Sequence, residues 1–384
     1  MKTRTRVAVL GWAHLLNDGS ANYLPGILPL VLTSLDVPRS QAGVLMGVLL
    51  IGQGLQPLTG ILSDAVGGRK VALGGIIGTT ITGALIGMAP SYPLLLALLV
   101  LLGITNSCFH PQALAGVRAL VGPNRAGPIS VFLVGGEVGR GVWPLLAGFV
   151  VTRAGLHGLW LLAIPAALSL PLIAASLPSL TPHKSALARI DWRPRASPLA
   201  RVIVFTALRV AVMFTLVTYL PLWWTDRSGS LVGGAGLVTT FFLASIVGNL
   251  GGGYLIDRLG VRPVATVASF LAVVFFAVFL WLDGAWVWLL VSLIAVCLFA
   301  TFAIPVVITQ ALLPESPSLG SGIAIGLCNA IGATGVMGLG LAVDALTVRG
   351  VLWVAVGIGV AATLAAFWLP EPERVAERVV AHQG

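Results

Sequence analysis

Two pairs of charged or titratable residues have helical spacing inside otherwise apolar sequence. Glu137 and Arg140 are three residues apart within the glycine-rich run Ser130–Gly148, and His14 and Asp18 are four residues apart. Residues at these spacings share one face of a helix and can pair. A buried carboxylate beside an imidazole or a guanidinium is a typical carrier of protons. We therefore expect these residues to bind protons or to form ion pairs within the protein.

The composition indicates that these pairs lie in a membrane. Only 9% of the 384 residues are charged, 57% are hydrophobic and the mean hydropathy is +1.00. Soluble domains average about 25% charged residues. A charge at mid-depth in a bilayer is costly, so it is expected to face protein or a water-filled cavity and marks a candidate functional site.

Apolar runs long enough to span a bilayer recur along the whole chain, and we expect an all-α membrane protein with twelve transmembrane helices. The inner loops and tails hold most of the Lys and Arg when the N-terminus is placed in the cytoplasm, and the outer loops hold only Arg39, Arg153, Arg227 and Arg349. This bias predicts cytoplasmic termini in a multi-pass inner or plasma membrane protein. The expected spans are 6–33, 40–63, 70–89, 92–116, 127–152, 157–177, 200–224, 232–256, 262–282, 286–312, 319–346 and 350–369.

An internal repeat divides the chain into two halves. Tyr23-Leu24-Pro25 recurs as Tyr219-Leu220-Pro221, and the stretch that begins at Gly60 recurs at Gly253 with nearly the same offset. Parallel repeats of this kind are typical of transporters. We predict a six-helix bundle over 1–177, a cytoplasmic linker over 178–199, a second six-helix bundle over 200–369 and a cytoplasmic tail over 370–384.

The repeated stretch carries the pattern G-x-L-x-D-x-x-G-x-R-K, complete in the first half and partly kept in the second. Its residues resemble the signature loop of the major facilitator superfamily. That resemblance implies a transporter with two pseudo-symmetric six-helix bundles and a loop involved in conformational change. The loop residues are Gly60, Asp64, Gly67, Arg69, Lys70, Asp257 and Arg262.

Three further stretches resemble the fosmidomycin-resistance group of bacterial drug-efflux antiporters. They are His14–Asp18, Phe109-His110-Pro111 and Ser130–Gly148. The resemblance implies export of small molecules in exchange for protons. Glu137 and Arg140 depart from that group, in which uncharged polar residues are expected, so the substrate does not follow from the resemblance.

The candidate site residues are polar or charged side chains within the expected spans. The proton-coupling candidates are Asp18, Glu137 and His14. The second half of the repeat lacks counterparts of Glu137 and Arg140, and this asymmetry favours that pair as the leading coupling site. Arg209 either reaches toward the inner surface or points inward. In the second case it would face Asp18 or Glu137, or hold an anionic substrate. The substrate-binding candidates are Arg140, Arg209, His110, Tyr23, Asn106, Tyr219 and Asn329.

These observations predict a proton-coupled antiporter, acting as a monomer in the lipid bilayer, that exports a small amphipathic or anionic compound. Alternatives are a proton-coupled importer of an organic anion, a divalent-metal transporter that uses the two histidines and a carboxylate, and a non-transporting sensor or lipid-handling protein. No phosphate-binding loop or nucleophile and base pair is evident. We expect no enzyme activity, no cofactor, no resident metal and no nucleic-acid partner, with the proton gradient as the driving force.

Overall fold

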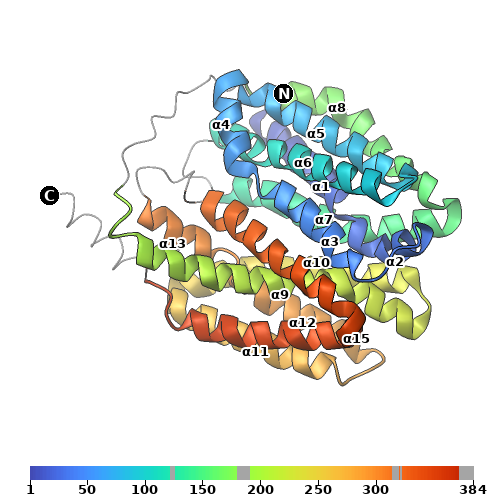
Figure 1. Cartoon of the computed structure of the whole chain (residues 1–384). Coiled ribbons are helices and arrows are strands. Elements are labelled where there is room, and N and C mark those ends of the chain that lie inside the picture. The colour runs from blue at the N-terminus through green and yellow to red at the C-terminus, as the bar shows by residue number, and fades with distance from the viewer. Residues whose placement is uncertain (122–125, 180–190, 314–319, 321, 372–384) are drawn as a thin grey trace. The chain divides into compact units, whose positions relative to one another are not determined.

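The computed structural model describes residues 1–121, 126–179, 191–313, 320 and 322–371. Within these ranges the chain is helical with no strands, as expected from the composition (Figure 1). The first half contains α1 (Thr3–Asn22), α2 (Leu24–Ser34), α3 (Gln41–Gln53), α4 (Gln56–Val66), α5 (Gly68–Leu85), η1 (Ile86–Met88), α6 (Tyr92–Val121), α7 (Ala126–Ala154), η2 (Leu156–Ala163) and α8 (Ile164–Ser176).

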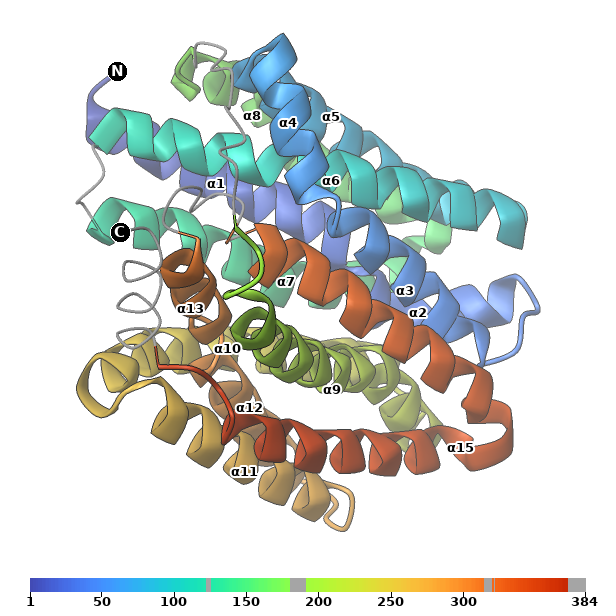
Figure 2. The same ribbon diagram turned by 60° about the vertical axis from the view of Figure 1, so that its left-hand side comes forward.

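The second half repeats this pattern of long apolar helices. Its elements are α9 (Ala196–Ser228), α10 (Leu231–Leu259), α11 (Val261–Phe279), α12 (Trp286–Ala300), α13 (Ile304–Leu312), the π-helix η3 (Gly322–Leu327) and α15 (Cys328–Ala366). Within this half α11 packs beside α12 and α15 (Figure 2). Thr347 interrupts α15 with a positive φ of 64°, so this long helix is divided into two spans.

Nine helical stretches among the described residues are long and apolar enough to cross a membrane. The bend at Thr347 makes two spans of Gly322–Ala366. Two further expected spans fall on α1 with α2 and on α7, which carry the charged pairs noted above. Each of the twelve expected spans thus coincides with helix in the described part of the chain.

The chain divides into two compact units. Unit 1 comprises Met1–Ser185 and Leu220–Leu243, and unit 2 comprises Ala186–Tyr219 and Ala244–Gly384. Half of the expected linker and nearly all of the expected tail lie outside the described residues.

In unit 1, glycines bring the backbones of α1 and α7 into direct contact. A Cβ at Gly135 or Gly139 of α7 would overlap the carbonyl oxygen of Gly11 or Leu15 of α1. Small residues allow this close approach in membranes, where packing, not water exclusion, holds helices together. The contact fixes the distance between the helix that carries Asp18 and the helix that carries Glu137 and Arg140.

Proline shapes the helix that carries His110. Pro111 lies inside α6 and has no N–H, so the carbonyl of Ser107 loses its helical donor. The Thr59 hydroxyl donates to this carbonyl at 2.9 Å. The hydrogen bond joins α4 to α6 and satisfies a backbone group that would otherwise be buried without a partner.

The two copies of the signature loop share a backbone feature. Gly67 and Gly260 each precede a helix with positive φ, 97° and 84°. Residues with a side chain adopt such conformations at a cost of about 1–3 kcal/mol. The repeat therefore keeps glycine here for conformational reasons.

We expect Gly67→Ala and Gly260→Ala each to lower the thermal unfolding midpoint of the purified protein. The added methyl group makes the positive φ unfavourable, at about 1–3 kcal/mol for each site. Gly253→Ala is the matched control, since Gly253 is helical and a Cβ there would meet no atom within 4 Å. An unfolding midpoint equal to that of the wild type in both loop variants would contradict this reading of the loop.

Candidate functional site

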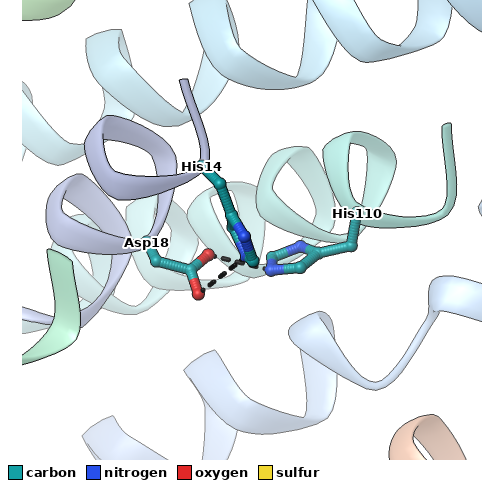
Figure 3. Close-up of side chains that lie close together, drawn as sticks. All are labelled: His14, Asp18 and His110. Carbon is teal, nitrogen blue, oxygen red and sulfur yellow. Dashed lines mark ion pairs between the residues drawn. The ribbon is translucent and has the colours of Figure 1, made fainter. Parts of the chain in front are cut away.

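Asp18 is the centre of a buried cluster of charged and titratable side chains in unit 1. It lies on α1, where the helix meets α7, and is only 1% exposed. Figure 3 shows the side chains of His14, from α1, and His110, from α6, directed toward its carboxylate. Burial of a carboxylate is unfavourable unless charged or hydrogen-bonding partners compensate for lost water.

Two such partners, His110 and Arg140, surround the Asp18 carboxylate, and His14 lies beside it without a hydrogen bond from its Nε2 to any described residue. His110 Nε2 lies 2.8 Å from Oδ1, Arg140 Nε donates to Oδ2 at 2.9 Å, and His14 Nε2 lies 3.4 Å from Oδ2. The Asn17 side-chain amide is 3.4 Å from Oδ1. The carboxylate therefore has partners from α1, α6 and α7.

Backbone carbonyls fix the orientation of both imidazole rings. Nδ1 of His14 lies 2.8 Å from the carbonyl oxygen of Phe132, and Nδ1 of His110 lies 3.0 Å from that of Asn106. A carbonyl oxygen can only accept, so each Nδ1 must carry the proton. Each Nε2 is thereby directed at Asp18, and the 2.8 Å contact of His110 is favourable only when a proton lies between nitrogen and oxygen.

Arg140 joins the cluster to a second carboxylate. Its Nη2 is 3.7 Å from Glu137 Oε1, which confirms that these two residues can pair across one helical turn. Glu137 is 4% exposed, whereas the Arg140 side chain is 23% exposed. The guanidinium therefore has two buried carboxylate partners and remains partly accessible.

Gly136 provides the space that the cluster occupies. A Cβ at this position would lie 2.5 Å from His14 Cε1 and Nε2 and 3.0 Å from Asp18 Oδ2. The aromatic ring of Phe132, one turn earlier on α7, stacks on His14 with centroids 4.3 Å apart. These contacts restrict the His14 ring to one position.

His14, Asp18 and His110 also have the side-chain types that bind metal ions. His14, Asp18 and His110 each offer one donor atom, and the three atoms lie within 4.8 Å of one another. However, the Arg140 guanidinium already binds the Asp18 carboxylate at 2.9 Å. Its fixed positive charge would face a divalent cation bound to the same oxygen, so the arrangement suits protons better than a metal ion.

Comparison with known proteins identifies the family. The chain matches the Major Facilitator Superfamily over residues 10–335, with a second match over 228–384. The chain belongs to this superfamily. It is a multi-pass membrane transporter and not an enzyme.

Similar proteins cover nearly the whole of this transporter. The fosmidomycin resistance protein of Escherichia coli is 26% identical over 369 residues, which cover 89% of this chain and 88% of that protein. The uncharacterised MFS-type transporter YfnC of Bacillus subtilis is 24% identical over 385 residues, covering 96% and 93%. Among solved structures, the nucleoside transporter NupG shares the fold with a TM-score of 0.78 at 16% identity, covering 96% of this chain and 100% of that one.

The remaining predicted substrate residues of this transporter are distributed over both units. In unit 1, the Tyr23 hydroxyl donates to the carbonyl of Gly83, and the buried side-chain nitrogen of Asn106 has no hydrogen-bond partner among the described residues. In unit 2, Arg209 and Tyr219 are buried and Asn329 is half-buried. The structure thus gathers only His14, Asp18, His110, Glu137 and Arg140 into one cluster.

Two loop residues of this transporter, Arg69 and Arg262, contact helix ends. Arg69 donates to the carbonyl of Ala174 at 2.8 Å, and Arg262 donates to that of Leu369 at 2.8 Å. Lys70 and Asp257 are exposed, and a Cβ at Gly60 would meet no atom within 4 Å. The side chain of Asp64 lies outside the described part of the structure.

Sequence reasoning did not identify two residues that shape the cluster. Phe132 contributes its ring and its carbonyl to His14, and Gly136 leaves room for both His14 and Asp18. Gly136 lies in the glycine-rich run Ser130–Gly148, where its sequence context does not set it apart from the other glycines. An apolar side chain such as Phe132 gives no sequence signal of the hydrogen bond that its backbone accepts.

Proposed function

We propose that this transporter is a proton-coupled antiporter that exports a small amphipathic compound, and that Asp18 is where proton and substrate compete. The proposal rests on one observation, the buried Asp18 carboxylate in contact with His110, His14 and Arg140. The similarity to a protein named for fosmidomycin resistance favours export.

Antiport requires that proton and substrate exclude each other. A polar group of the substrate that donates a hydrogen bond would take the Asp18 oxygen now shared with His110, and the displaced proton would leave to water. A returning proton would restore the His110 contact and release the substrate. Arg140 would keep the carboxylate in place during the exchange, because it holds the other oxygen.

The proton gradient supplies enough free energy for this exchange. One charge moving across 100 mV provides about 2.3 kcal/mol, and each unit of pH difference adds about 1.4 kcal/mol. A single proton per cycle can therefore support a substrate gradient of more than tenfold.

A second candidate function follows from the accessibility of Arg140. An anionic substrate would compete with Asp18 and Glu137 for the guanidinium, and the freed carboxylates would then bind protons more tightly. Proton and anion would bind together, which is the condition for symport. The same cluster would in that case serve a proton-coupled importer of an organic anion.

The direction of proton movement on substrate binding separates the two functions. Purified protein in weakly buffered detergent, with a pH-indicator dye, should release protons when an exported substrate binds and take them up when an anionic substrate binds for import.

We further propose that the protein works as a monomer in the inner or plasma membrane with both termini in the cytoplasm. The distribution of basic residues favours this orientation.

We expect Arg140→Gln to reduce transport driven by a pH gradient in proteoliposomes by roughly tenfold or more, the equivalent of one lost charge-assisted hydrogen bond. Arg153→Gln is the matched control, because Arg153 is an exposed arginine on the same helix. Equal loss in both variants would contradict a specific role for Arg140. A solute flux that is the same with and without the pH gradient would exclude proton coupling.

A further inference from the structure

Unit 2 contains a buried arginine that has no acidic partner among the residues that the structure describes. Arg209, on α9, is 4% exposed and so does not extend to solvent. Its Nη1 donates a long hydrogen bond of 3.4 Å to the carbonyl of Leu298, and its Nε has no hydrogen-bond partner in the described part of the chain. Within the described ranges, no carboxylate forms an ion pair with it.

The other neighbours of Arg209 do not compensate for its charge. The guanidinium lies 5.7 Å from the centroid of the Phe302 ring, and the Cys328 thiol is close enough to interact with it electrostatically. An aromatic face attracts a cation weakly, and a neutral thiol carries no charge. A guanidinium stays protonated in proteins, so the positive charge persists in an apolar environment. A bound anion would compensate for this buried positive charge.

A small cavity adjoins Arg209 among α9, α11, α12 and α15. The centre of a water-sized sphere can occupy about 10 Å³ of it, so the cavity has room for one water molecule or one small ion. Ser269, which is itself buried, contributes a hydroxyl to the lining, and the rest of the wall is mainly apolar. Lining residues include Arg209, Ser269, Phe276, Leu298, Val356 and Gly359.

We propose that this cavity binds a small monovalent anion of the size of chloride, held by Arg209 Nε and the Ser269 hydroxyl. The cavity has two donors and no acidic group, so it matches an anion in both charge and hydrogen bonding. The volume excludes a lipid headgroup or an organic carboxylate. A water molecule could satisfy Nε but would leave the charge uncompensated. This site is separate from the Asp18 cluster and does not depend on the proposed antiport.

The test is the anion dependence of thermal stability for the purified full-length protein in detergent. Sodium gluconate is replaced stepwise by sodium chloride at constant ionic strength, so that general salt effects cancel. We expect a saturable rise of the unfolding midpoint of about 2–4 °C, as for a ligand that binds only the folded state. Bromide should replace chloride, and gluconate, which is too large for the cavity, should not.

Variants assign the effect to this site. Arg209→Met, which keeps length and removes the charge, should abolish the chloride-dependent shift, and Ser269→Ala should weaken it. Arg201→Met is the matched control, because Arg201 is exposed on the same helix, and its shift should equal that of the wild type. Cys328→Ala should also keep the shift.

Several outcomes would overturn the proposal. They are a wild-type midpoint that is the same in chloride and gluconate, a chloride effect that persists in Arg209→Met, or a chloride effect that appears only in Cys328→Ala. The last result would identify a Cys328 thiolate as the counterion. If Arg209→Met does not fold, crystals of the wild type grown in bromide decide the question. An anomalous peak beside Arg209 Nε supports the site, and its absence at full bromide exchange rejects it.

Discussion

Asp18→Asn is expected to abolish transport driven by a pH gradient while the protein remains folded. Asparagine has nearly the shape of aspartate but cannot exchange a proton. The His110 Nε2 contact at 2.8 Å would lose its carboxylate, and Arg140 would pair with Glu137, now 3.7 Å away. We expect pH-driven flux in proteoliposomes to fall by roughly 100-fold, as for loss of a group that transfers a proton.

The control and the readout separate coupling from folding. Asp36→Asn is the matched control, because Asp36 is exposed and its positive φ of 50° suits asparagine. Size-exclusion profiles should be alike for the wild type and both variants. The Asp18→Asn protein should also no longer release protons when substrate binds. If pH-driven flux continues at the wild-type rate, the coupling residue is not Asp18, and Glu137→Gln becomes the next variant to measure.

Gly139→Ala is expected to cause a large loss of stability. The new Cβ would overlap the carbonyl oxygen of Leu15 on α1, and a backbone atom cannot rotate away as a side chain can. The two helices would have to separate, at a cost of about 3 kcal/mol. We expect an unfolding midpoint several degrees below that of the wild type and a lower yield of folded protein.

Gly74→Ala provides the comparison for this prediction. Gly74 is also helical, but a Cβ there would meet no atom within 4 Å, so alanine should be neutral or slightly stabilising through its higher helix propensity. The separation of α1 from α7 should also move Asp18 away from Arg140, and Gly139→Ala should therefore reduce pH-driven transport per folded molecule. Equal midpoints in the two glycine variants would contradict the close packing of α1 against α7.

Local spacing in the sequence predicted part of the candidate site. The pairs His14 with Asp18 and Glu137 with Arg140 are each one helical turn apart, and both occur as contacts in the structure. The apolar runs likewise predicted the helices, and the repeated loop predicted the family. These features depend on residues close together in the chain or on a known motif.

The convergence of the two pairs could not be predicted in this way. Asp18 and Arg140 are separated by 122 positions, and only the packing of α1 against α7 brings them to 2.9 Å. The sequence favoured Glu137 with Arg140 as the leading coupling site, because the second half of the repeat has no charged residue at the corresponding positions. The geometry instead places Asp18 in the middle, with partners from three helices. Its role in coupling remains a prediction.

Arg209 illustrates a different limit. The sequence left open whether this side chain reaches the inner surface or points inward, because both fit its place on the seventh span. The structure buries it in unit 2 beside Leu298 and Phe302. Periodicity alone cannot decide the direction of one long side chain, because the answer depends on cavities that neighbouring helices leave between them.

The backbone anchoring of the two imidazoles has an evolutionary consequence. The oxygens that hold His14 and His110 belong to the main chain at Phe132 and Asn106, and every amino acid supplies such an oxygen. Selection can therefore replace the side chain at position 106 to suit a new cargo without changing which nitrogen carries the proton. Relatives that handle different compounds could then retain one proton relay while the residues around it diversify.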